Sequence, residues 1–521
     1  MSPARASVTQ LDPQGGAHPI EPDLPSFARR YDEGGAQVAW TRLVADLETP
    51  VSVMLKLAHE RPNSFLLESV EGGSTRGRYS IIGCEPDLVW RANGATAEIN
   101  RMPQSDPEDF APSPLPTLAS LRALLAESAI ALPPELPPMA AGIFGYMGYD
   151  TVRLIERLPN RKPDSLGLPD SILVRPTLIV IFDSVRDEMT VVTPVRPAPG
   201  VRAKAAYARA VDRLNLALER LERALPHTSE IDTGAPHPEA KAGTAPRAYM
   251  AKVARAKDYI AAGDIFQVVL SQSFEAPFTL PSFALYRALR RVNPSPFLYY
   301  LNFGGFAVVG SSPEILVRVR DGTVTIRPIA GTRPRGATPE EDAALAKELL
   351  ADTKERAEHL MLLDLGRNDV GRVAEIGTVT VTDSFFLEYY SQVMHIVSNV
   401  EGRLGGGFDA VDALMAGFPA GTVSGAPKVR AMEIIDELED QARGLYAGCV
   451  GYFSAGGEMD SCIVLRTSVV KDGTMYVRAG AGIVADSVPE REQAECMSKA
   501  RALFKAADEA VRFAARAKRG Q

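Results

Sequence analysis

Residues 297–328 read FLYYLNFGGFAVVGSSPEILVRVRDGTVTIRP. Short runs of β-branched and aromatic residues predict four consecutive strands in this stretch, at 297–303, 306–309, 315–320 and 323–328. Helical spacing predicts neighbouring helices at 282–291, 339–351 and 354–365. Because strands and helices come in mixed runs, without the regular alternation of a doubly wound parallel sheet, the pattern favours an α+β fold.

The rest of the chain carries further segments of both kinds. Further helices are predicted at 51–59, 118–128, 202–225, 249–262 and 489–517. Further strands are predicted at 37–45, 65–70, 79–84, 87–91, 173–183, 188–193 and 266–274. Prolines interrupt residues 103–116, which predicts a loop.

Two segments without periodicity divide the chain. Residues 1–24 are rich in Pro, Gly and Ala, which predicts a disordered tail. Residues 226–247 mix Pro, Gly, Thr, Ala and charged residues, which predicts a linker. The expected units are therefore an N-terminal region over 25–225 and a C-terminal region over 248–515.

Composition excludes several classes of protein. The 521 residues include 57 Lys and Arg against 65 Asp and Glu, so the net charge is −8 and no basic footprint of a nucleic-acid binder is present. An anionic substrate would therefore need local positive groups or a metal. No apolar run reaches the roughly 18 residues of a membrane span, and the N-terminus does not read as a signal peptide. The four cysteines form no C-x-x-C pair, and a reducing cytoplasmic location is the default expectation.

Two glycine-rich segments have the composition of anion-binding loops. The segment Gly480–Ala485 matches a dinucleotide fingerprint only in part and lacks the βαβ context, so we expect backbone N–H groups that face an anion. The segment Gly421–Lys428 lacks the ending of a Walker phosphate loop. Basic residues beside glycine-rich turns would suit a carboxylate, although each one alone is more often a surface charge: Arg333, Arg335, Arg466 and Lys428.

Acidic residues three apart share a helix face at two places, Glu355 with Glu358 and Glu492 with Glu495. Carboxylates from two helices would hold one hard cation, while the alternative is a solvated acidic face. The only histidines of the second half are His359 and His395. Spacing alone does not decide whether either histidine is structural or catalytic.

Six motifs occur together and in order: Gly263–Ser271, Gly310–Glu314, Pro328–Thr332, Glu358–Asp369, Gly421–Lys428 and Gly480–Gly482. With them, the chain resembles the chorismate-using enzymes over roughly residues 38–504, and most of all the anthranilate synthase component I family. The resemblance implies a β-sandwich core of two packed sheets with helices outside and chorismate bound between the layers. It also implies that the region 248–515 binds chorismate and that the region 25–225 contributes a tryptophan-binding part.

The family's chemistry implies a role for each matching residue. Ammonia adds to chorismate, pyruvate is eliminated and anthranilate forms, with Mg²⁺ on Glu358 and Glu495. The implied catalytic residues are Glu314 as general acid, His395, Gln267, Thr422 and Lys428. The implied substrate-binding residues are Gly331, Thr332, Tyr446, Arg466, Gly480, Ala481 and Gly482.

Two positions distinguish among members of this family. Isochorismate and salicylate synthases carry a Lys that activates water where this chain has Gln267. Aminodeoxychorismate synthases often carry a nucleophilic Lys where this chain has Ala330. Both positions favour anthranilate synthase. The alternatives are aminodeoxychorismate synthase component I and a catalytically inactive tryptophan-binding regulator.

The resemblance also implies an inhibitor site and partners. The tryptophan feedback pocket would consist of Glu68, Ser69, Asn293, Pro294, Pro296, Phe297 and Leu298. A core strand and a tight turn are the structural alternative, and Phe297-Leu298 departs from the family's usual Tyr-Met. No cysteine has the context of a glutaminase nucleophile, so ammonia would come from a separate glutaminase subunit, in a hetero-oligomer with neither nucleic acid nor membrane as a partner.

Overall fold

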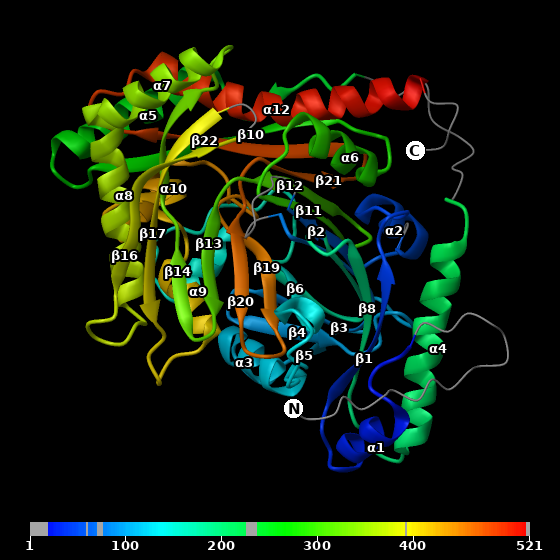
Figure 1. Cartoon of the computed structure of the whole chain (residues 1–521). Helices are drawn as coiled ribbons and strands as arrows, with labels where there is room; N and C mark the ends of the chain where they lie inside the picture. The colour runs from blue at the N-terminus through cyan, green and yellow to red at the C-terminus, as the bar shows by residue number, and fades with distance from the viewer. Residues whose placement is uncertain (1–18, 59–60, 70–76, 226–236, 391–392, 517–521) are drawn as a thin grey trace.

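The computed structural model describes residues 19–58, 61–69, 77–225, 237–390 and 393–516 (Figure 1). The helices are α1 Leu24–Asp32, α2 Pro50–Leu57, α3 Thr117–Ser128, α4 Ala203–Glu222, α5 Pro246–Ala261, α6 Ser282–Val292, α7 Pro339–Ala351, α8 Thr353–Gly371, α9 Ala410–Gly417, α10 Gly421–Ser424, α11 Lys428–Leu438 and α12 Pro489–Arg516. Two 3₁₀ turns are η1 Pro138–Ala140 and η2 Tyr149–Leu154.

The strands of the first half are β1 Gln37–Val44, β2 Ser64–Glu68, β3 Tyr79–Asn93, β4 Thr96–Asn100, β5 Ala111–Pro112, β6 Gly142–Met147, β7 Ser171–Asp183, β8 Glu188–Val195 and β9 Lys241–Ala242. Those of the second half are β10 Gln267–Pro277, β11 Phe297–Asn302, β12 Ala307–Ser312, β13 Ile315–Arg320, β14 Thr323–Ile326, β15 Ile329–Pro334, β16 Thr380–Tyr389, β17 Val393–Arg403, β18 Gly425–Ala426, β19 Cys449–Ser454, β20 Met459–Ile463, β21 Thr467–Lys471 and β22 Thr474–Ile483.

All strand pairs are antiparallel, and they form two arms that meet at β7. One arm runs β1-β8-β7-β3-β2-β11-β12-β21-β22-β10. The other runs β7-β6-β19-β20-β13-β14-β17, and β15 and β16 both pair with β17. The start of β7 pairs with β6 and its end pairs with β8, so both arms share this strand.

A buried core joins the two arms. Phe65 of β2 stacks on Phe144 of β6 with ring centroids 4.6 Å apart, and Tyr299 and Tyr452 belong to the same cluster. The α+β prediction is confirmed by this mixture of helices and antiparallel strands. The predicted division into two separate sheets is not confirmed, because hydrogen bonds connect every strand into a single sheet.

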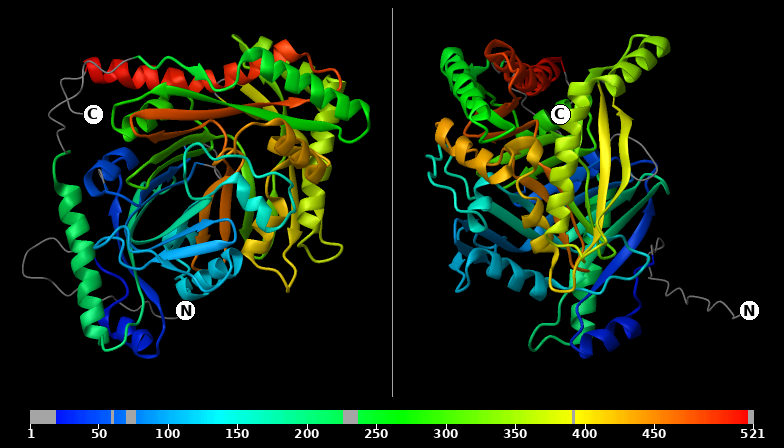
Figure 2. Two further views of the ribbon diagram at one scale, coloured as in Figure 1. Left: turned by 180° about the vertical axis from the view of Figure 1, so that it is seen from behind. Right: turned by 90° about the vertical axis from the view of Figure 1, so that its left-hand side faces the viewer.

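Helices cover the outer faces of the arms. The long helix α12 lies across β22 and β10, beside α5 and α6, while α4 runs along the far end near α1 and α2 (Figures 1 and 2). The side chains of Cys496, Leu503 and Phe504 anchor α12 in the largest core cluster. Helix α8 packs on β15 and β17 instead, so the C-terminal half of the chain has helices on two sides of its strands.

The predicted helices and strands occur near their expected bounds, but the prediction was incomplete. It omitted helices α1, α9, α10 and α11 and strands β4, β5, β6, β9 and β15 to β22. The predicted strands 79–84 and 87–91 are one strand, β3, which bends where Glu85 has a positive φ of 53° and the register shifts. The predicted strand 323–328 ends at Ile326, and β15 begins three residues later. Strand β16 was not predicted because its first half is exposed and polar.

The segments expected to be irregular are described only in part. Residues 1–18 of the predicted tail and 226–236 of the predicted linker lie outside the described residues. Beyond them, Glu21 forms a β-bridge with Trp40 and α1 begins at Leu24. Within the linker range, β9 pairs with β10 and α5 begins at Pro246. Among the helices that the structure describes, none is long and apolar enough to cross a membrane.

Candidate active site

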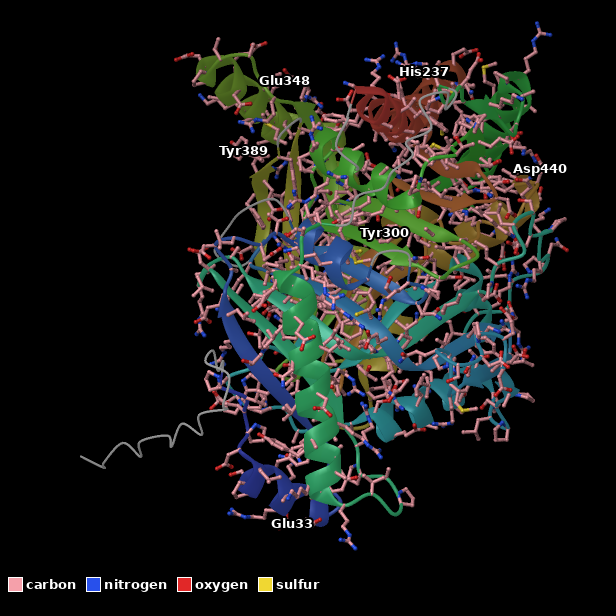
Figure 3. The ribbon with its side chains drawn as sticks, turned by 90° about the vertical axis from the view of Figure 1, so that its right-hand side faces the viewer. Glu33, His237, Tyr300, Glu348, Tyr389 and Asp440 are labelled. Atoms are coloured by element: carbon pink, nitrogen blue, oxygen red, sulfur yellow. The ribbon has the colours of Figure 1, made fainter. Side chains whose placement is uncertain are left out.

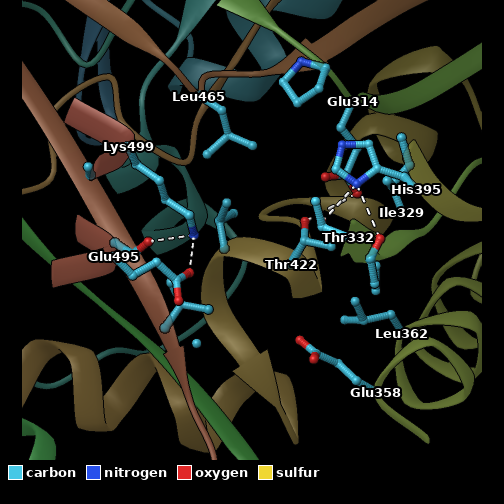
Figure 4. A pocket seen from close by; sticks show the side chains of 18 of the residues that line it. Glu314, Ile329, Thr332, Glu358, Leu362, His395, Thr422, Leu465, Glu495 and Lys499 are labelled. Atoms are coloured by element: carbon cyan, nitrogen blue, oxygen red, sulfur yellow. Dashed lines mark hydrogen bonds and ion pairs between the residues drawn. The ribbon is translucent and has the colours of Figure 1, made fainter. Parts of the chain in front are cut away.

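A cavity of about 590 Å³ lies where β10, β15, β17 and β22 meet α8, α10 and α12 (Figure 4). The predicted residues that line it are Gln267, Glu314, Gly331, Thr332, Glu358, His395, Thr422, Tyr446, Arg466, Gly480, Gly482 and Glu495. These residues lie as far as 228 positions apart in the chain, between Gln267 and Glu495. The fold therefore gathers almost the whole predicted set around one space.

Two predicted residues do not line the cavity. The ammonium of Lys428 lies 2.7 Å from the carboxylate of Asp369, and both side chains are nearly buried. This ion pair fastens the start of α11 to α8. The side chain of Ala481 is fully buried in the core cluster, because alternate residues of β22 face opposite sides and Gly480 and Gly482 face the cavity.

Glu314 sits in the turn between β12 and β13, with its side chain almost wholly buried. The hydroxyl of Thr422 in α10 donates a hydrogen bond of 3.3 Å to its carboxyl oxygen. Burial raises the pKa of Glu314 to about 8, and the hydrogen bond from Thr422 opposes only part of that shift. The cavity therefore contains a carboxyl group that is protonated at neutral pH.

His395 of β17 is held by the opposite strand, β15. Its Nδ1 lies 3.2 Å from the carbonyl oxygen of Gly331 and 2.9 Å from the hydroxyl of Thr332. Since a carbonyl oxygen only accepts, Nδ1 carries the proton and Nε2 keeps a lone pair. Burial, and then the nearby charge of Arg466, lower the pKa of His395 to about 4, so the imidazole is neutral at neutral pH.

His359 has a structural role instead. It is fully buried, its Nε2 lies 2.6 Å from the hydroxyl of Ser398, and its ring packs against Phe385. It does not line the cavity. Sequence spacing left open whether His359 is structural or catalytic, and its burial away from the cavity decides for a structural role.

Carboxylates face each other at one end of the cavity. Gln267 donates a 3.0 Å hydrogen bond to Glu358. Burial raises the pKa of Glu358, and the carboxylates of Glu355 and Glu495 raise it further. Within the described ranges, no group of three or more His, Cys, Asp or Glu side chains surrounds a common point.

Lys499 is a lining residue that sequence reasoning missed. Its ammonium lies 2.7 Å from Glu495 and donates a 3.0 Å hydrogen bond to the carbonyl of Gly480. Figure 4 shows this pair on the side of the cavity opposite His395 and Thr332. The available signal was its position four residues after Glu495, on the same face of α12.

Two glycines allow side chains to approach β22. A Cβ atom at residue 482 would lie 2.7 Å from Nε2 of Gln267, and one at residue 480 would lie 2.7 Å from the hydroxyl of Tyr446. Any larger residue would displace a lining side chain. These glycines are therefore required by close packing, in addition to any contact of their N–H groups with an anion.

A buried ion network supports the wall behind the cavity. Glu439 lies 2.6 Å from Arg443 and 2.9 Å from Arg478, and all three side chains are nearly inaccessible to solvent. Glu439 also accepts hydrogen bonds from the backbone and the hydroxyl of Ser271. Arg478 lines the cavity and adds positive charge to it. The sequence motifs did not indicate this network.

A second cavity, of about 410 Å³, lies near the predicted tryptophan site. Of the predicted residues, those that line it are Glu68, Ser69, Pro296, Phe297 and Leu298, whereas Asn293 and Pro294 do not. The nearly buried carboxylate of Glu68 contacts the guanidinium of Arg290 and accepts a 2.5 Å hydrogen bond from Tyr286. The sequence also did not indicate its polar lining, formed by Arg78, Arg318, Arg320, Arg327 and Asp460.

Comparison with known proteins defines the class. The model of the chorismate binding enzyme family matches residues 65–505. The chain therefore belongs to the chorismate-binding enzyme family. Within that family, the predicted placement with the anthranilate synthase component I enzymes is confirmed by the relatives described next.

Three curated relatives and solved structures illustrate the similarity. Anthranilate synthase component 1 of Cereibacter sphaeroides is 58% identical over 95% of this chain and 99% of its own. The protein of that name from Thermus thermophilus is 49% identical over 89% and 96%. The crystal structure of anthranilate synthase component I from Streptococcus pneumoniae has a TM-score of 0.72 at 35% identity, covering 89% of this chain and 98% of that one.

A more distant structure shares the fold alone. The menaquinone-specific isochorismate synthase of Escherichia coli has a TM-score of 0.68 at 19% identity, covering 93% of this chain and 98% of that one. The same scaffold therefore hosts different reactions, so the reaction of this chain has to be argued from its cavity.

Proposed function

We propose that the chain is the ammonia-using large component of an anthranilate synthase, which converts chorismate to anthranilate at the first step of tryptophan biosynthesis. The observation that carries the proposal is the buried Glu314 carboxyl, protonated at neutral pH and placed in a cavity with positive groups. A hydroxyl leaves poorly unless it receives a proton, and a group with a pKa near the working pH is suited to give it.

The reaction balances without an oxidant. Ammonia forms a bond to ring carbon 2 while the bond between carbon 4 and its hydroxyl breaks, and the proton of Glu314 makes the hydroxyl leave as water. The enolpyruvyl ether bond then breaks, carbon 2 loses a proton, and pyruvate and the aromatic ring form. Chorismate and ammonia thus give anthranilate, pyruvate and water. The neutral His395, with its free Nε2 lone pair, is our candidate for assisting the proton loss.

Positive and neutral donors suit the two carboxylates of chorismate. We assign the enolpyruvyl carboxylate to Arg466, Tyr446 and the N–H groups of β22, and the ring end to Gly331 and Thr332. Lys499 and Arg478 supply further positive charge inside the cavity, which a protein of net charge −8 would not provide at long range.

We assign Mg²⁺ to Glu358 and Glu495, which both line the cavity. Burial raises the pKa of Glu358, and the nearby carboxylates of Glu355 and Glu495 raise it further; a divalent cation would relieve this repulsion. Mg²⁺ commonly takes only one or two protein carboxylates and keeps water and substrate oxygens for the rest, which agrees with a pair instead of a larger cluster. When bound, the ion would neutralise the ring carboxylate and orient the ring.

Two lining residues argue against the other reactions of this scaffold. Gln267 is a neutral amide that donates to Glu358, so it does not serve as a base that activates water. Ala330 lines the cavity with a methyl group and is no nucleophile, which argues against an aminodeoxychorismate synthase. Ammonia attack followed by pyruvate loss is the reaction that remains.

The cysteines support a separate source of ammonia. All four, Cys84, Cys449, Cys462 and Cys496, are free and buried, and burial raises the pKa of each thiol. A glutaminase needs a reactive thiolate, so we propose that a glutamine amidotransferase subunit supplies the ammonia in a cytoplasmic hetero-oligomer.

We further propose that L-tryptophan binds in the second cavity and inhibits the enzyme. In this proposal the two arms of the sheet act as two packed layers, and they lie between the second cavity and the active-site cavity. Ser69 supports this binding because its buried hydroxyl has no hydrogen-bond partner within the described part of the chain. A buried polar group without a partner is costly unless a ligand or water satisfies it. The arginines of this cavity would receive the amino acid's carboxylate.

The test uses the purified chain with chorismate, Mg²⁺ and ammonium at alkaline pH, with the products separated and identified. We expect anthranilate and pyruvate in equal amounts, no turnover with glutamine alone, and suppression by tryptophan. Glu358→Gln should lose Mg²⁺-dependent activity, while the exposed Glu375→Gln serves as a matched control. Aminodeoxychorismate without pyruvate would assign the protein to the alternative reaction, and no turnover would support a regulatory protein.

A further inference from the structure

A continuous chain of contacts links the second cavity to the candidate active site. Arg327, between β14 and β15, lines the second cavity. Its Nη2 donates to one carboxylate oxygen of Glu388 at 2.6 Å, and the hydroxyl of Tyr390 donates to the other oxygen at 2.7 Å. One carboxylate at the end of β16 therefore holds both side chains.

The chain of contacts continues from Tyr390 to His395. Their rings meet edge to face with centroids 5.4 Å apart and an interplanar angle of 66°. Glu388 and His395 are direct partners in the register of β16 and β17. His395 in turn contacts Gly331 and Thr332, which form the wall of the active-site cavity.

The properties of this chain suit a coupling element. The side chains of Arg327 and Glu388 are only 16% and 20% exposed, so their ion pair is less screened than a surface pair. A guanidinium presents its N–H donors in a planar fork, so a second carboxylate beside Arg327 draws donors and charge away from Glu388. Strand β16 is mostly exposed, so a shift of this strand disturbs little of the core.

We propose that Glu388 and Tyr390 are positioning residues for His395, and that Arg327 makes this position depend on an amino-acid carboxylate in the second cavity. The inference rests on the proposed function and names the residues that carry its regulation. A carboxylate beside Arg327 competes with Glu388 for one guanidinium. Weakening of that pair loosens the contact of Glu388 with the Tyr390 hydroxyl, and this changes how the Tyr390 ring packs on His395. The ligand thereby makes different contacts in the two arrangements, which is what it needs to shift a conformation.

Tyr390→Phe tests the link because it keeps the ring against His395 and removes only the hydroxyl. The probe is L-tryptophan, whose binding is measured by calorimetry and whose inhibition is measured at fixed chorismate. We expect binding within about twofold of the wild type, an inhibitory concentration at least about fivefold higher, and a kcat about fivefold lower with KM for chorismate unchanged, the size expected for one hydrogen bond.

The neighbouring Tyr389→Phe is the matched control. Tyr389 is 52% exposed at the edge of the molecule (Figure 3) and contacts Arg335 through its ring. We expect its binding, inhibition and kcat to equal those of the wild type. If Tyr390→Phe fails to fold, the isosteric Glu388→Gln replaces it. Since its neutral amide competes less for Arg327, we expect tryptophan to bind at least as tightly as in the wild type while inhibition and kcat fall.

Two outcomes overturn the coupling. The first is unchanged inhibition and kcat in Tyr390→Phe, and the second is an equal loss of tryptophan binding and inhibition, which would make Tyr390 part of the ligand pocket. If the wild type neither binds tryptophan nor is inhibited by it, the feedback proposal itself fails. The positioning role is then decided by kcat of Tyr390→Phe alone, and an unchanged value refutes it.

Discussion

The buried Glu314 carboxyl gives the sharpest prediction, because one substitution should affect stability and activity in opposite directions. Its pKa is about 8 in the folded chain against an ordinary value of 4.5. Between these values the folded state binds a proton that the unfolded state has lost, so the free energy of unfolding falls as pH rises. From pH 6 to pH 8 this single group should cost about 2 kcal/mol of stability.

Glu314→Gln keeps the size of the side chain and has no charge to bury. We expect its free energy of unfolding, relative to wild type, to rise by about 2 kcal/mol between pH 6 and pH 8, because only the wild type loses stability there. Urea unfolding at several pH values measures the difference. Glu275→Gln, on an exposed position of β10, is the control and should show no such trend.

The same variant should lose about 10²- to 10⁴-fold in kcat, since glutamine donates no proton to the leaving hydroxyl. With the concentration of unprotonated ammonia held constant, wild-type activity should decline above pH 8 as Glu314 ionises. A stability difference that is the same at pH 6 and pH 8 would refute the buried, protonated carboxyl. A variant with normal kcat would refute its role as the acid.

Three further substitutions probe other parts of the structure. Gly482→Ala should displace Gln267 from Glu358, because the new Cβ would lie 2.7 Å from Nε2 of Gln267. We expect kcat/KM for chorismate to fall at least about tenfold, while circular dichroism shows that the variant still folds. Glu439→Gln should lower the free energy of unfolding by about 3–5 kcal/mol, since it leaves two buried guanidinium groups without their carboxylate; an unchanged Tm would contradict the network. Ser69→Arg should relieve tryptophan inhibition and spare kcat, and an unaltered inhibition curve would reject the second cavity as the inhibitor site.

The sequence predicted the fold class, eight of the twelve described helices and ten of the twenty-two described strands, where local patterns report burial. The alternating or apolar runs of β1, β7, β10 and β11 are strands, as expected, since their side chains face buried surfaces. The prediction also omitted buried strands such as β6, β17 and β22, and the glycine-rich end of β22 was read as a loop. Strand β16 was missed because its first half is exposed and polar, and its pairing with β17 forms it.

The motifs and the family resemblance predicted which residues would share one site. The family resemblance placed Glu314, Glu358, His395 and Glu495 in one predicted site, and the fold brings these four around one cavity. Membership in a motif does not show which way a side chain points. Lys428 was therefore included in the predicted site, although its ammonium pairs with Asp369 away from the cavity.

The burial of side chains, their charge states and the contacts between residues far apart in the chain depend on the tertiary structure. Burial in the folded chain raises the pKa of Glu314, His359 lies in the core, and Lys499 lies beside Glu495. The fold also joins Arg327 to His395 through side chains of another strand. The physical reason is that a pKa and a contact depend on solvent exclusion and neighbours supplied by remote segments, whereas sequence patterns report only the local backbone and its apolar face.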